Sequence, residues 1–215
     1  MILETITSSS LHDSVPASQL EPLVPATARG EATRRKLLAA AEEEFGTKGF
    51  HIASVSSITT RAGVGQGTFY LYFRTKEEVF VTLVREIGRN LRRVMREAMV
   101  GAPDRLRGER LALDAFFAFA CTRQGLYRIV QESQFVDEAV YREYYERIAR
   151  GYADDLDLAA QKGELAPGNA EIRAWSLIGI SHFVGMRWCL WTGQVPPTAE
   201  VDAMMDLVSH GMAPR

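Results

Sequence analysis

Residues 54–76 read SVSSITTRAGVGQGTFYLYFRTK, and this stretch decides the fold of the 215-residue chain. It predicts two short helices around a tight turn, followed by a third helix. Ser54 is expected to cap the first helix, because its hydroxyl can accept a backbone N–H that a helix start leaves free. Gly63 then ends that helix, since glycine adopts the left-handed conformation without strain. Phe69 and Phe73, four residues apart, share the inward face of the second helix.

The opposite face of the second helix is polar and open. Its positions are Gly65, Gln66, Gly67, Thr68, Tyr70 and Tyr72. The two glycines leave the helix start without side chains, so the backbone can approach another surface closely. A carboxamide can read adenine edges, threonine can contact the thymine methyl group, and tyrosine can reach phosphate. We therefore expect this face to enter a DNA groove. The alternative is an ordinary helical hairpin with tyrosines at its surface.

These segments resemble a known family. Residues 55–80, VSSITTRAGVGQGTFYLYFRTKEEVF, are similar to the DNA-binding segment of the tetracycline-repressor (TetR) family. Residues 33–50, TRRKLLAAAEEEFGTKGF, resemble that family's first helix. The chain departs from the family pattern at Gly65, where serine is common, and at Gln66, where lysine is common. These two departures bear on base preference rather than on the family.

The resemblance implies an all-α chain with an N-terminal three-helix helix-turn-helix DNA-binding domain and a C-terminal helical bundle for ligand binding and dimerisation. Residues 1–28 lack basic side chains and periodicity, so we expect a disordered tail there. We expect the DNA-binding domain over 29–76 and the ligand-binding and dimerisation domain over 77–215.

Charged and polar groups next to the reading helix complete the expected DNA surface. The first helix is expected over Thr33–Lys48. Arg34, Arg35 and Lys36 would then crowd its first turn, where cations oppose the helix dipole unless phosphate lies nearby. Thr75 and Glu78 form a capping-box pattern that opens the next helix, with Lys76 in its first turn as a phosphate clamp. The candidate DNA-binding residues are Arg34, Arg35, Ser54, Ser56, Gly65, Gln66, Gly67, Thr68, Tyr70, Tyr72 and Lys76.

Charge is distributed unevenly along the chain. Residues 29–93 carry 12 basic and 7 acidic side chains, whereas residues 94–215 carry 13 basic and 17 acidic ones. A mildly basic module joined to an acidic one is typical of a DNA reader attached to a sensing domain.

The rest of the chain is helical in pattern. Apolar positions continue from Val79 to Met95 on one long helix, which would join the DNA-binding part to the second domain. Further helices are expected over 110–123, 126–136, 139–163 and 169 to about 191, and after Thr198. The two cysteines, Cys121 and Cys189, lie in apolar runs without metal-ligand spacing. We expect buried free thiols, with a redox switch as the alternative.

The second domain is rich in aromatic side chains, most of which must form its core. The family resemblance implies a ligand cavity between these helices, with apolar walls and a few polar groups. The candidate lining residues are Phe116, Phe119, Arg128, Gln131, Phe135, Tyr144, Trp175 and His182. A hydrogen-bonded core histidine is the competing interpretation of His182. We expect a small effector that is apolar or amphipathic.

The last two helices carry a candidate subunit interface. Two glycines allow close helix approach, and the resemblance also implies dimerisation here, in a four-helix bundle shared by two subunits. The candidate interface residues are Ile178, Gly179, Phe183, Gly185, Met186, Met204, Met205 and Val208. Packing of the same helices within one chain is the alternative.

Together these features predict a homodimeric, sequence-specific DNA-binding transcriptional regulator. We expect a repressor, with activation as the alternative, that a largely apolar ligand releases from a near-palindromic operator. Two reading helices would enter successive major grooves about 34–36 Å apart. A helical carrier of small molecules without DNA binding is the alternative function.

An enzyme is not expected, because the sequence has no phosphate loop, nucleophile–base motif or Glu-x-x-His pair. We expect neither cofactor nor metal. The first residues lack the pattern of a signal peptide. The apolar segment 174–191 is interrupted by His182 and Arg187, so we expect a buried helix rather than a membrane span, in a cytoplasmic protein.

Overall fold

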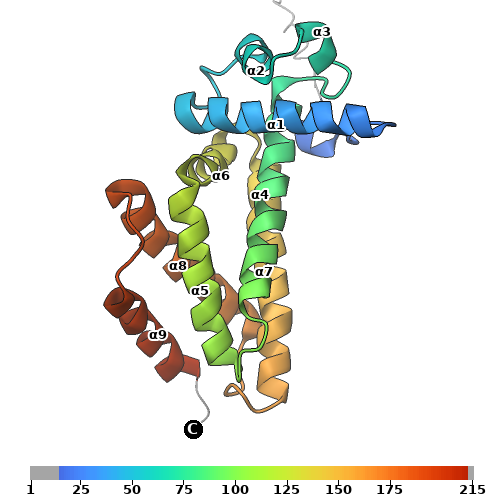
Figure 1. Cartoon of the computed structure of the whole chain (residues 1–215). Helices are drawn as coiled ribbons and strands as arrows, with labels where there is room; N and C mark the ends of the chain where they lie inside the picture. The colour runs from blue at the N-terminus through green and yellow to red at the C-terminus, as the bar shows by residue number, and fades with distance from the viewer. Residues whose placement is uncertain (1–14, 213–215) are drawn as a thin grey trace, which may run out of the picture.

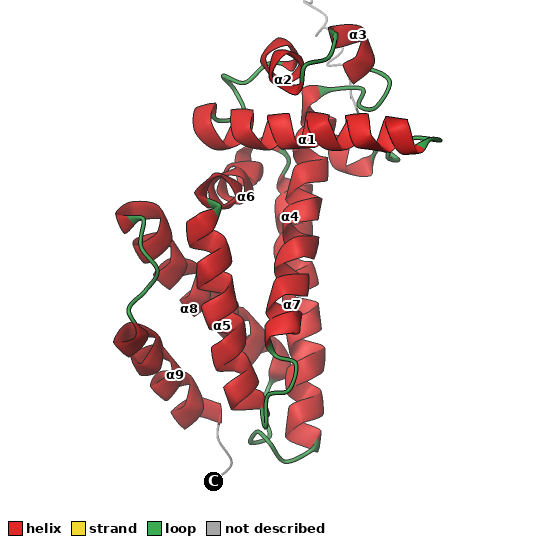
Figure 2. Cartoon of the chain, viewed as in Figure 1, coloured by secondary structure: helices red, strands yellow, loops and turns green. Residues whose placement is uncertain are grey.

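The computed structural model describes residues 15–212, and in this range the chain consists of helices and loops without strands (Figure 1, Figure 2). The elements in order are the 3₁₀-helix η1 (Ala17–Gln19), α1 (Ala28–Lys48), α2 (Val55–Ala62), α3 (Gln66–Phe69), α4 (Lys76–Ala98), α5 (Arg105–Thr122), α6 (Gln124–Val136), α7 (Glu138–Gln161), α8 (Ala170–Gly185), the π-helix η2 (Met186–Thr192) and α9 (Thr198–Met212). The all-α prediction is confirmed.

The long helices α4, α5 and α7 run side by side away from α1, which lies across their end (Figure 1). Helices α2 and α3 cover the far side of α1, and α6 packs beneath it. Helix α8 packs on α7, and α9 packs on α5. The expected helix-turn-helix module therefore sits at one end of a helical bundle, and α4 runs from one into the other.

Helix α1 begins earlier than predicted. The hydroxyl of Thr27 accepts a hydrogen bond from the backbone N–H of Gly30 at 3.1 Å, so Thr27 is the cap and the helix starts at Ala28. The expected start at Thr33 is wrong, and so is the placement of the basic run, Arg34 to Lys36, in the first turn. The family-like segment begins inside the helix, which hid its true start.

One hydrophobic core spans the end of the bundle. Phe45 and Phe50 pack edge to face or tilted against each other and against Phe80 of α4, with ring centroids 5.1–5.7 Å apart. The same cluster contains Phe69 from α3 and Ile129 from α6. This core includes residues on both sides of position 76, the predicted domain boundary. A movement of α4 or α6 therefore displaces the helix-turn-helix end of the molecule, helices α1–α3, which we call the reading module.

Helices α1 and α6 approach each other at two glycines. A Cβ atom on Gly46 would stand 2.9 Å from the Cα atom of Gly125, and a Cβ on Gly125 would stand 3.2 Å from the Cα of Gly46. Only hydrogen at both positions permits this backbone contact. The contact joins α1 to the start of α6.

The segment before α1 is not a disordered tail over its described part. The backbone N–H of Ser18 donates to a carboxylate oxygen of Asp137 at 3.0 Å, and its carbonyl oxygen accepts from Arg85 at 2.7 Å. Further on, the carbonyl of Glu21 accepts from Arg74 at 2.9 Å. These hydrogen bonds hold residues 15–21 along α4 and the start of α7. The remainder of the predicted tail, residues 1–14, lies outside the described residues.

Helix α4 starts with only half of the predicted capping box. Thr75 accepts from the backbone N–H of Glu78, as expected, at 3.1 Å. The Glu78 carboxylate does not return to Thr75. It accepts from the backbone N–H of Arg74 at 2.6 Å and from the Arg74 guanidinium at 2.9 Å. Glu78 therefore fixes the loop that precedes the helix.

The single helix expected from about Asn169 to Trp191 changes its winding on the way. Asn169 caps α8 by accepting from the N–H of Ile172 at 3.0 Å, as its position predicts. The helix continues as the π-helix η2 after Gly185 and ends at Gly193, which has φ +70°. Within residues 15–212, no helix is both long enough and apolar enough to cross a membrane.

The two cysteines form a disulfide bond, which corrects the prediction of free thiols. Cys121 in the last turn of α5 is bonded to Cys189 in η2, across 68 positions of sequence. Distance along the chain concealed the pairing, because only the packing of η2 on α5 brings the two sulfur atoms together.

Candidate nucleic-acid interface and ligand pocket

The helix-turn-helix forms where its local signals predict, but its second helix is shorter than expected: α3 covers only Gln66–Phe69, so Tyr72 and Phe73 follow the helix instead of lying on it. Ser54 and Ser57 make a reciprocal capping box at the start of α2, with hydrogen bonds of 3.0 and 3.1 Å. Gly63 ends the helix in the left-handed conformation at φ 68°. Phe69 and Phe73 are both buried, with ring centroids 5.8 Å apart. The turn between the helices is thereby fixed from both sides.

Ion pairs fasten α2 to α1. The carboxylate of Glu44, almost fully buried, accepts from Lys48 at 2.6 Å and from Arg61 at 2.7 Å. These hydrogen bonds hold the pKa of Glu44 down at about 2. Because Glu44 belongs to α1 and Arg61 to α2, the pair sets the position of α2 on α1.

The outward face of this module is open at most of the predicted DNA-binding positions. The exposed candidates are Arg35, Ser54, Ser56, Gly65, Gln66, Gly67 and Tyr70. Thr68 and Tyr72 are half-buried. A Cβ atom on Gly65 or Gly67 would have no atom within 4 Å, so the start of α3 presents bare backbone to solvent.

Arg34 does not point where the sequence suggested. Its side chain is only 15% exposed, lies over the ring of Phe73 at 5.2 Å, and approaches Glu86 of α4 at 3.8 Å. The guanidinium therefore occupies the seam between α1 and α4. Arg35, the next residue, is exposed and remains a phosphate candidate.

Lys76 also turns inward. Its ammonium group donates to the backbone carbonyl oxygens of Phe50 at 2.7 Å and Ala53 at 2.9 Å, and lies over the Phe50 ring at 4.1 Å. Free carbonyls after α1 and an aromatic face satisfy the cation within the chain. The structure thus gives Lys76 a loop-closing contact in place of the predicted phosphate clamp.

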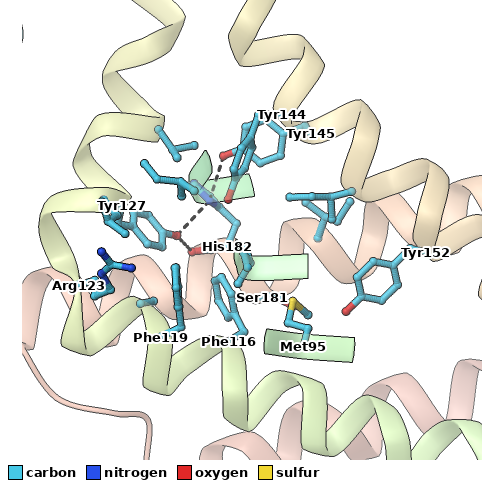
Figure 3. Close-up of a pocket in the computed structure, with 17 residues that line it drawn as sticks. Met95, Phe116, Phe119, Arg123, Tyr127, Tyr144, Tyr145, Tyr152, Ser181 and His182 are labelled. Atoms are coloured by element: carbon cyan, nitrogen blue, oxygen red, sulfur yellow. Dashed lines mark hydrogen bonds between the residues drawn. The ribbon is translucent and has the colours of Figure 1, made fainter. Parts of the chain in front are cut away.

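A cavity of about 60 Å³ lies among α4, α5, α6, α7 and α8 (Figure 3). Its walls are mostly apolar and aromatic. The lining residues are Ile87, Leu91, Met95, Phe116, Phe119, Ala120, Arg123, Leu126, Tyr127, Val130, Tyr144, Tyr145, Ile148, Tyr152, Ile178, Ser181 and His182. We call this space the aromatic chamber. Five helices contribute to it, so whatever fills it acts on their spacing.

One corner of the aromatic chamber is polar. The hydroxyl of Tyr127 lies 3.0 Å from Nδ1 of His182 and also donates to the backbone carbonyl of His182, while the hydroxyl of Tyr145 lies 3.3 Å from Nδ1 (Figure 3). Burial lowers the pKa of His182 and raises the pKa of both tyrosines. Near neutral pH this corner therefore holds neutral hydrogen-bonding groups.

A second space of about 280 Å³ adjoins the first between α4, α5 and α7. It shares Leu91, Met95, Ile148 and Tyr152 with the aromatic chamber. Its charged lining residues are Arg92, Arg96, Arg105, Asp154 and Asp155. We call it the arginine chamber.

The arginines of the second chamber differ in how they are satisfied. Buried Arg105 donates to Glu109 at 2.9 Å, and Tyr152 donates to the same carboxylate at 2.9 Å. Burial raises the pKa of Glu109, and the charge of Arg105 opposes the rise. Burial also lowers the pKa of Arg92, together with repulsion from neighbouring cations, Arg147 first. Arg92 is thus a half-buried cation in a positive surrounding.

The predicted ligand-binding residues divide into two groups. Phe116, Phe119, Tyr144 and His182 line the aromatic chamber. The others do not: Arg128, Phe135 and Trp175 are exposed, and Gln131 contacts the sulfur of Met186 at 3.4 Å outside it. Residue type alone indicates those four positions, and the helix faces on which they lie point elsewhere.

Sequence reasoning missed further lining residues. The tyrosines at 127, 145 and 152 and the isoleucine at 148 all face the aromatic chamber. Tyr145, Ile148 and Tyr152 lie three and four residues apart on α7, so their shared helix face was visible in the sequence.

Several predicted interface residues are buried within the chain. Met204, Met205 and Val208 of α9 belong to the core that α9 forms with α5 and α8. Gly185 is buried, and a Cβ there would stand 3.0 Å from the ring of Phe116. Ile178 lines the aromatic chamber, and half-buried Met186 contacts Gln131. The intrachain alternative fits these positions.

Another face of α8 is exposed and apolar. Ile172, Trp175 and Phe183 are 61%, 40% and 64% exposed, and a Cβ atom added at Gly179 between them would have no atom within 4 Å. Their spacing of three and four residues places them on one stripe. We call these four residues the α8 stripe, and it retains Gly179 and Phe183 from the predicted set.

Known proteins are similar to this chain in sequence and in fold. Residues 37–83 match the family model described as "Bacterial regulatory proteins, tetR family". The chain is 30% identical over 156 residues to the HTH-type transcriptional activator FasR of Mycolicibacterium smegmatis, covering 72% of this chain and 71% of that protein. It is 29% identical over 140 residues to the fatty acid metabolism regulator protein of Bacillus subtilis, covering 62% and 71%.

A solved structure agrees with the architecture. The fatty acid degradation regulator FadR from Bacillus halodurans superimposes with a TM-score of 0.74 at 22% identity, over 83% of this chain and 95% of that one. At this identity the likeness concerns the fold.

Proposed function

The chain belongs to the tetR family of bacterial regulatory proteins and is a DNA-binding transcriptional regulator, and from this we propose that it acts as a homodimer which leaves its operator when an anionic amphiphile fills the two chambers. The link between ligand binding and DNA binding in this proposal is the continuous helix α4. This helix begins at the reading module, lines both chambers with Leu91 and Met95, and has no break over Lys76–Ala98. We propose repression, and the name of FasR makes activation the second candidate.

The DNA-binding part of the proposal rests on the bare, polar start of α3. Gln66 is exposed between two glycines that have open space around them. A carboxamide on bare backbone can descend into the major groove and form a bidentate contact with adenine. Tyr70 and Arg35, both exposed, are our candidates for phosphate contacts, joined by Ser54, Ser56 and the half-buried Thr68 and Tyr72.

We expect Gln66→Ala to relax base preference at one position of each half-site. A bidentate contact discriminates against a wrong base by about 1–3 kcal/mol, so the preference should fall about tenfold. Binding to nonspecific DNA should change little. The measurement is enrichment from a randomised duplex pool by wild type and variant. Arg35→Ala is the matched control, because loss of a phosphate contact weakens all sequences alike and flattens the salt dependence. Identical enriched sequences for wild type and Gln66→Ala would remove Gln66 from the readers.

The two chambers adjoin each other and share four lining residues, and their combined lining suits an anionic amphiphile. The aromatic chamber offers apolar walls to an alkyl chain, and the arginine chamber offers Arg92 and Arg96 to an anionic group. Burial, and after it repulsion from Arg147, lower the pKa of Arg92, and an anion bound beside Arg92 would offset both effects. The name of the Bacillus subtilis relative, a fatty acid metabolism regulator, agrees with a ligand of this chemistry.

We expect dodecanoate to bind at least tenfold more tightly than dodecanol, because a hydrogen bond to a charged group contributes about 1.5–3 kcal/mol. Arg92→Gln should remove most of that difference. The control is Arg93→Gln, because Arg93 is exposed and paired with Glu97 at 3.1 Å. Titration calorimetry with both ligands measures the ratio. Equal affinities of the wild type for acid and alcohol would contradict the proposed anion site.

The dimer part rests on the α8 stripe. A contiguous exposed row of large apolar side chains is unusual for a lone subunit and marks an interaction surface. Two copies related by a two-fold axis would cover the stripe with itself. This arrangement would set the distance between the two α3 helices, and a near-palindromic operator follows from the same symmetry.

A further inference from the structure

The disulfide bond lies where three parts of the molecule meet. Cys121 is in the last turn of α5, and Cys189 is in η2, which continues α8. The side-chain amide of Gln124 donates to the backbone carbonyl of Cys189 at 2.7 Å, so a hydrogen bond joins the same two segments. The corner between α5 and α6 is therefore fastened to η2 by one covalent bond and one hydrogen bond.

The corner between α5 and α6 contacts helix α1 of the reading module. Arg123 pairs with Glu42 of α1 at 2.8 Å, and Gly125 meets Gly46 of α1 backbone to backbone. The corner also touches the ligand space, because Ala120 and Arg123 line the aromatic chamber. On the other side of the disulfide, η2 follows the helix that carries the α8 stripe. The bond thus joins the α5–α6 corner covalently to the helix of the proposed subunit contact, and the corner in turn contacts α1 through an ion pair and backbone packing.

The two sulfur atoms differ in access. Cys189 is fully buried, whereas Cys121 is half-buried, so Cys121 is the end of the bond that is more open to an attacking thiolate. In compartments that hold DNA, thiols are kept reduced, and the disulfides that form there are usually transient or redox-sensing. A bond with one accessible sulfur atom in a DNA-binding regulator fits that class.

We propose that the Cys121–Cys189 bond is a redox-controlled tether that tunes operator affinity. Closed, it holds the α5–α6 corner and η2 at one separation, and so holds the two reading helices of a dimer in the spacing that DNA requires. Open, it lets the corner move relative to the subunit contact, and the reading helices sample more spacings. Loss of this preorganisation weakens DNA binding.

A dithiol can open the bond as the reductant, and a hydroperoxide can close it again as the oxidant. A thiolate of the dithiol attacks Sγ of Cys121 and expels the Cys189 thiolate, which takes up a proton. The second thiol of the reductant then displaces Cys121 and closes a disulfide in the reductant. In reverse, the Cys121 thiolate attacks the hydroperoxide to give a sulfenic acid and an alcohol, and the Cys189 thiol condenses with it and releases water.

The test uses the full-length protein and a duplex enriched from random DNA by the oxidised wild type. Reduction with dithiothreitol should weaken binding to this duplex about tenfold, a typical coupling between two sites. Reoxidation with cumene hydroperoxide should restore it. Cys121→Ser should bind like the reduced wild type and respond to neither reagent. Thiol titration should count no free thiols before reduction and two after it.

The reductant series on the wild type needs no substitution, so a variant that misfolds leaves the test intact. Circular dichroism establishes that both redox forms are folded at the assay temperature. Less than a twofold change in affinity between folded oxidised and reduced wild type would overturn the proposal. Two free thiols per chain after peroxide treatment would do so as well, and so would an equal response of Cys121→Ser to reductant.

Discussion

Phe183→Glu is expected to convert the dimer into monomers and to weaken operator binding by about 100-fold or more. Phe183 is 64% exposed within one chain, so the substitution should leave the folded monomer nearly unaffected. In a two-fold dimer the change buries two carboxylates in the proposed interface, and a buried unpaired charge is strongly unfavourable. In the dimer, binding of one reading helix raises the effective concentration of the other at its half-site. A monomer lacks this gain in affinity.

The matched control is Phe135→Glu, which places the same charge on α6 at a phenylalanine that is 80% exposed. That variant should remain a dimer and bind the duplex like the wild type. Light scattering after size exclusion gives the mass, and fluorescence anisotropy gives the affinity. Ile172→Glu, at the other end of the α8 stripe, should behave like Phe183→Glu. A dimeric Phe183→Glu protein with normal affinity would move the subunit contact to another surface.

Local signals in the sequence were enough to predict the turn of the helix-turn-helix and the residues that anchor it. Capping by Ser54, the left-handed turn at Gly63 and the burial of Phe69 and Phe73 depend on neighbours within a few residues. Exposure of charged groups depends on more distant geometry. The ammonium group of Lys76 donates to carbonyl oxygens more than 20 positions away in the sequence, so the residues around Lys76 do not predict those acceptors.

Side-chain directions in the second domain are harder to predict from sequence for the same reason. Residue type alone does not tell which aromatic faces a cavity, so Phe135 and Trp175 were placed there although both are exposed. Apolar stripes on α9 and α8 look alike in sequence. Only packing reveals that Met204 faces α9's own core while Phe183 faces solvent. The disulfide is the extreme case, because its two cysteines are 68 positions apart.

Gly46→Val is expected to lower the free energy of unfolding by about 3 kcal/mol, at the upper end of the range for overpacked cores. The new Cβ would stand 2.9 Å from the backbone of Gly125, so the helices themselves must separate. For a chain of this size the melting temperature should fall by about 6–12 °C. Differential scanning calorimetry measures the change. The control is Gly151→Val on α7, where a Cβ meets no atom within 4 Å and little change is expected.

The cause can be separated from ordinary side-chain crowding, because both partners at this contact are already glycines. No smaller residue at position 125 can relieve the clash, so large-to-small rescue is impossible. Gly125→Val alone should destabilise by a similar amount. In the double variant the second valine should add much less than it does alone, since the helices have already separated. Fully additive effects would show that each glycine is required by a different neighbour.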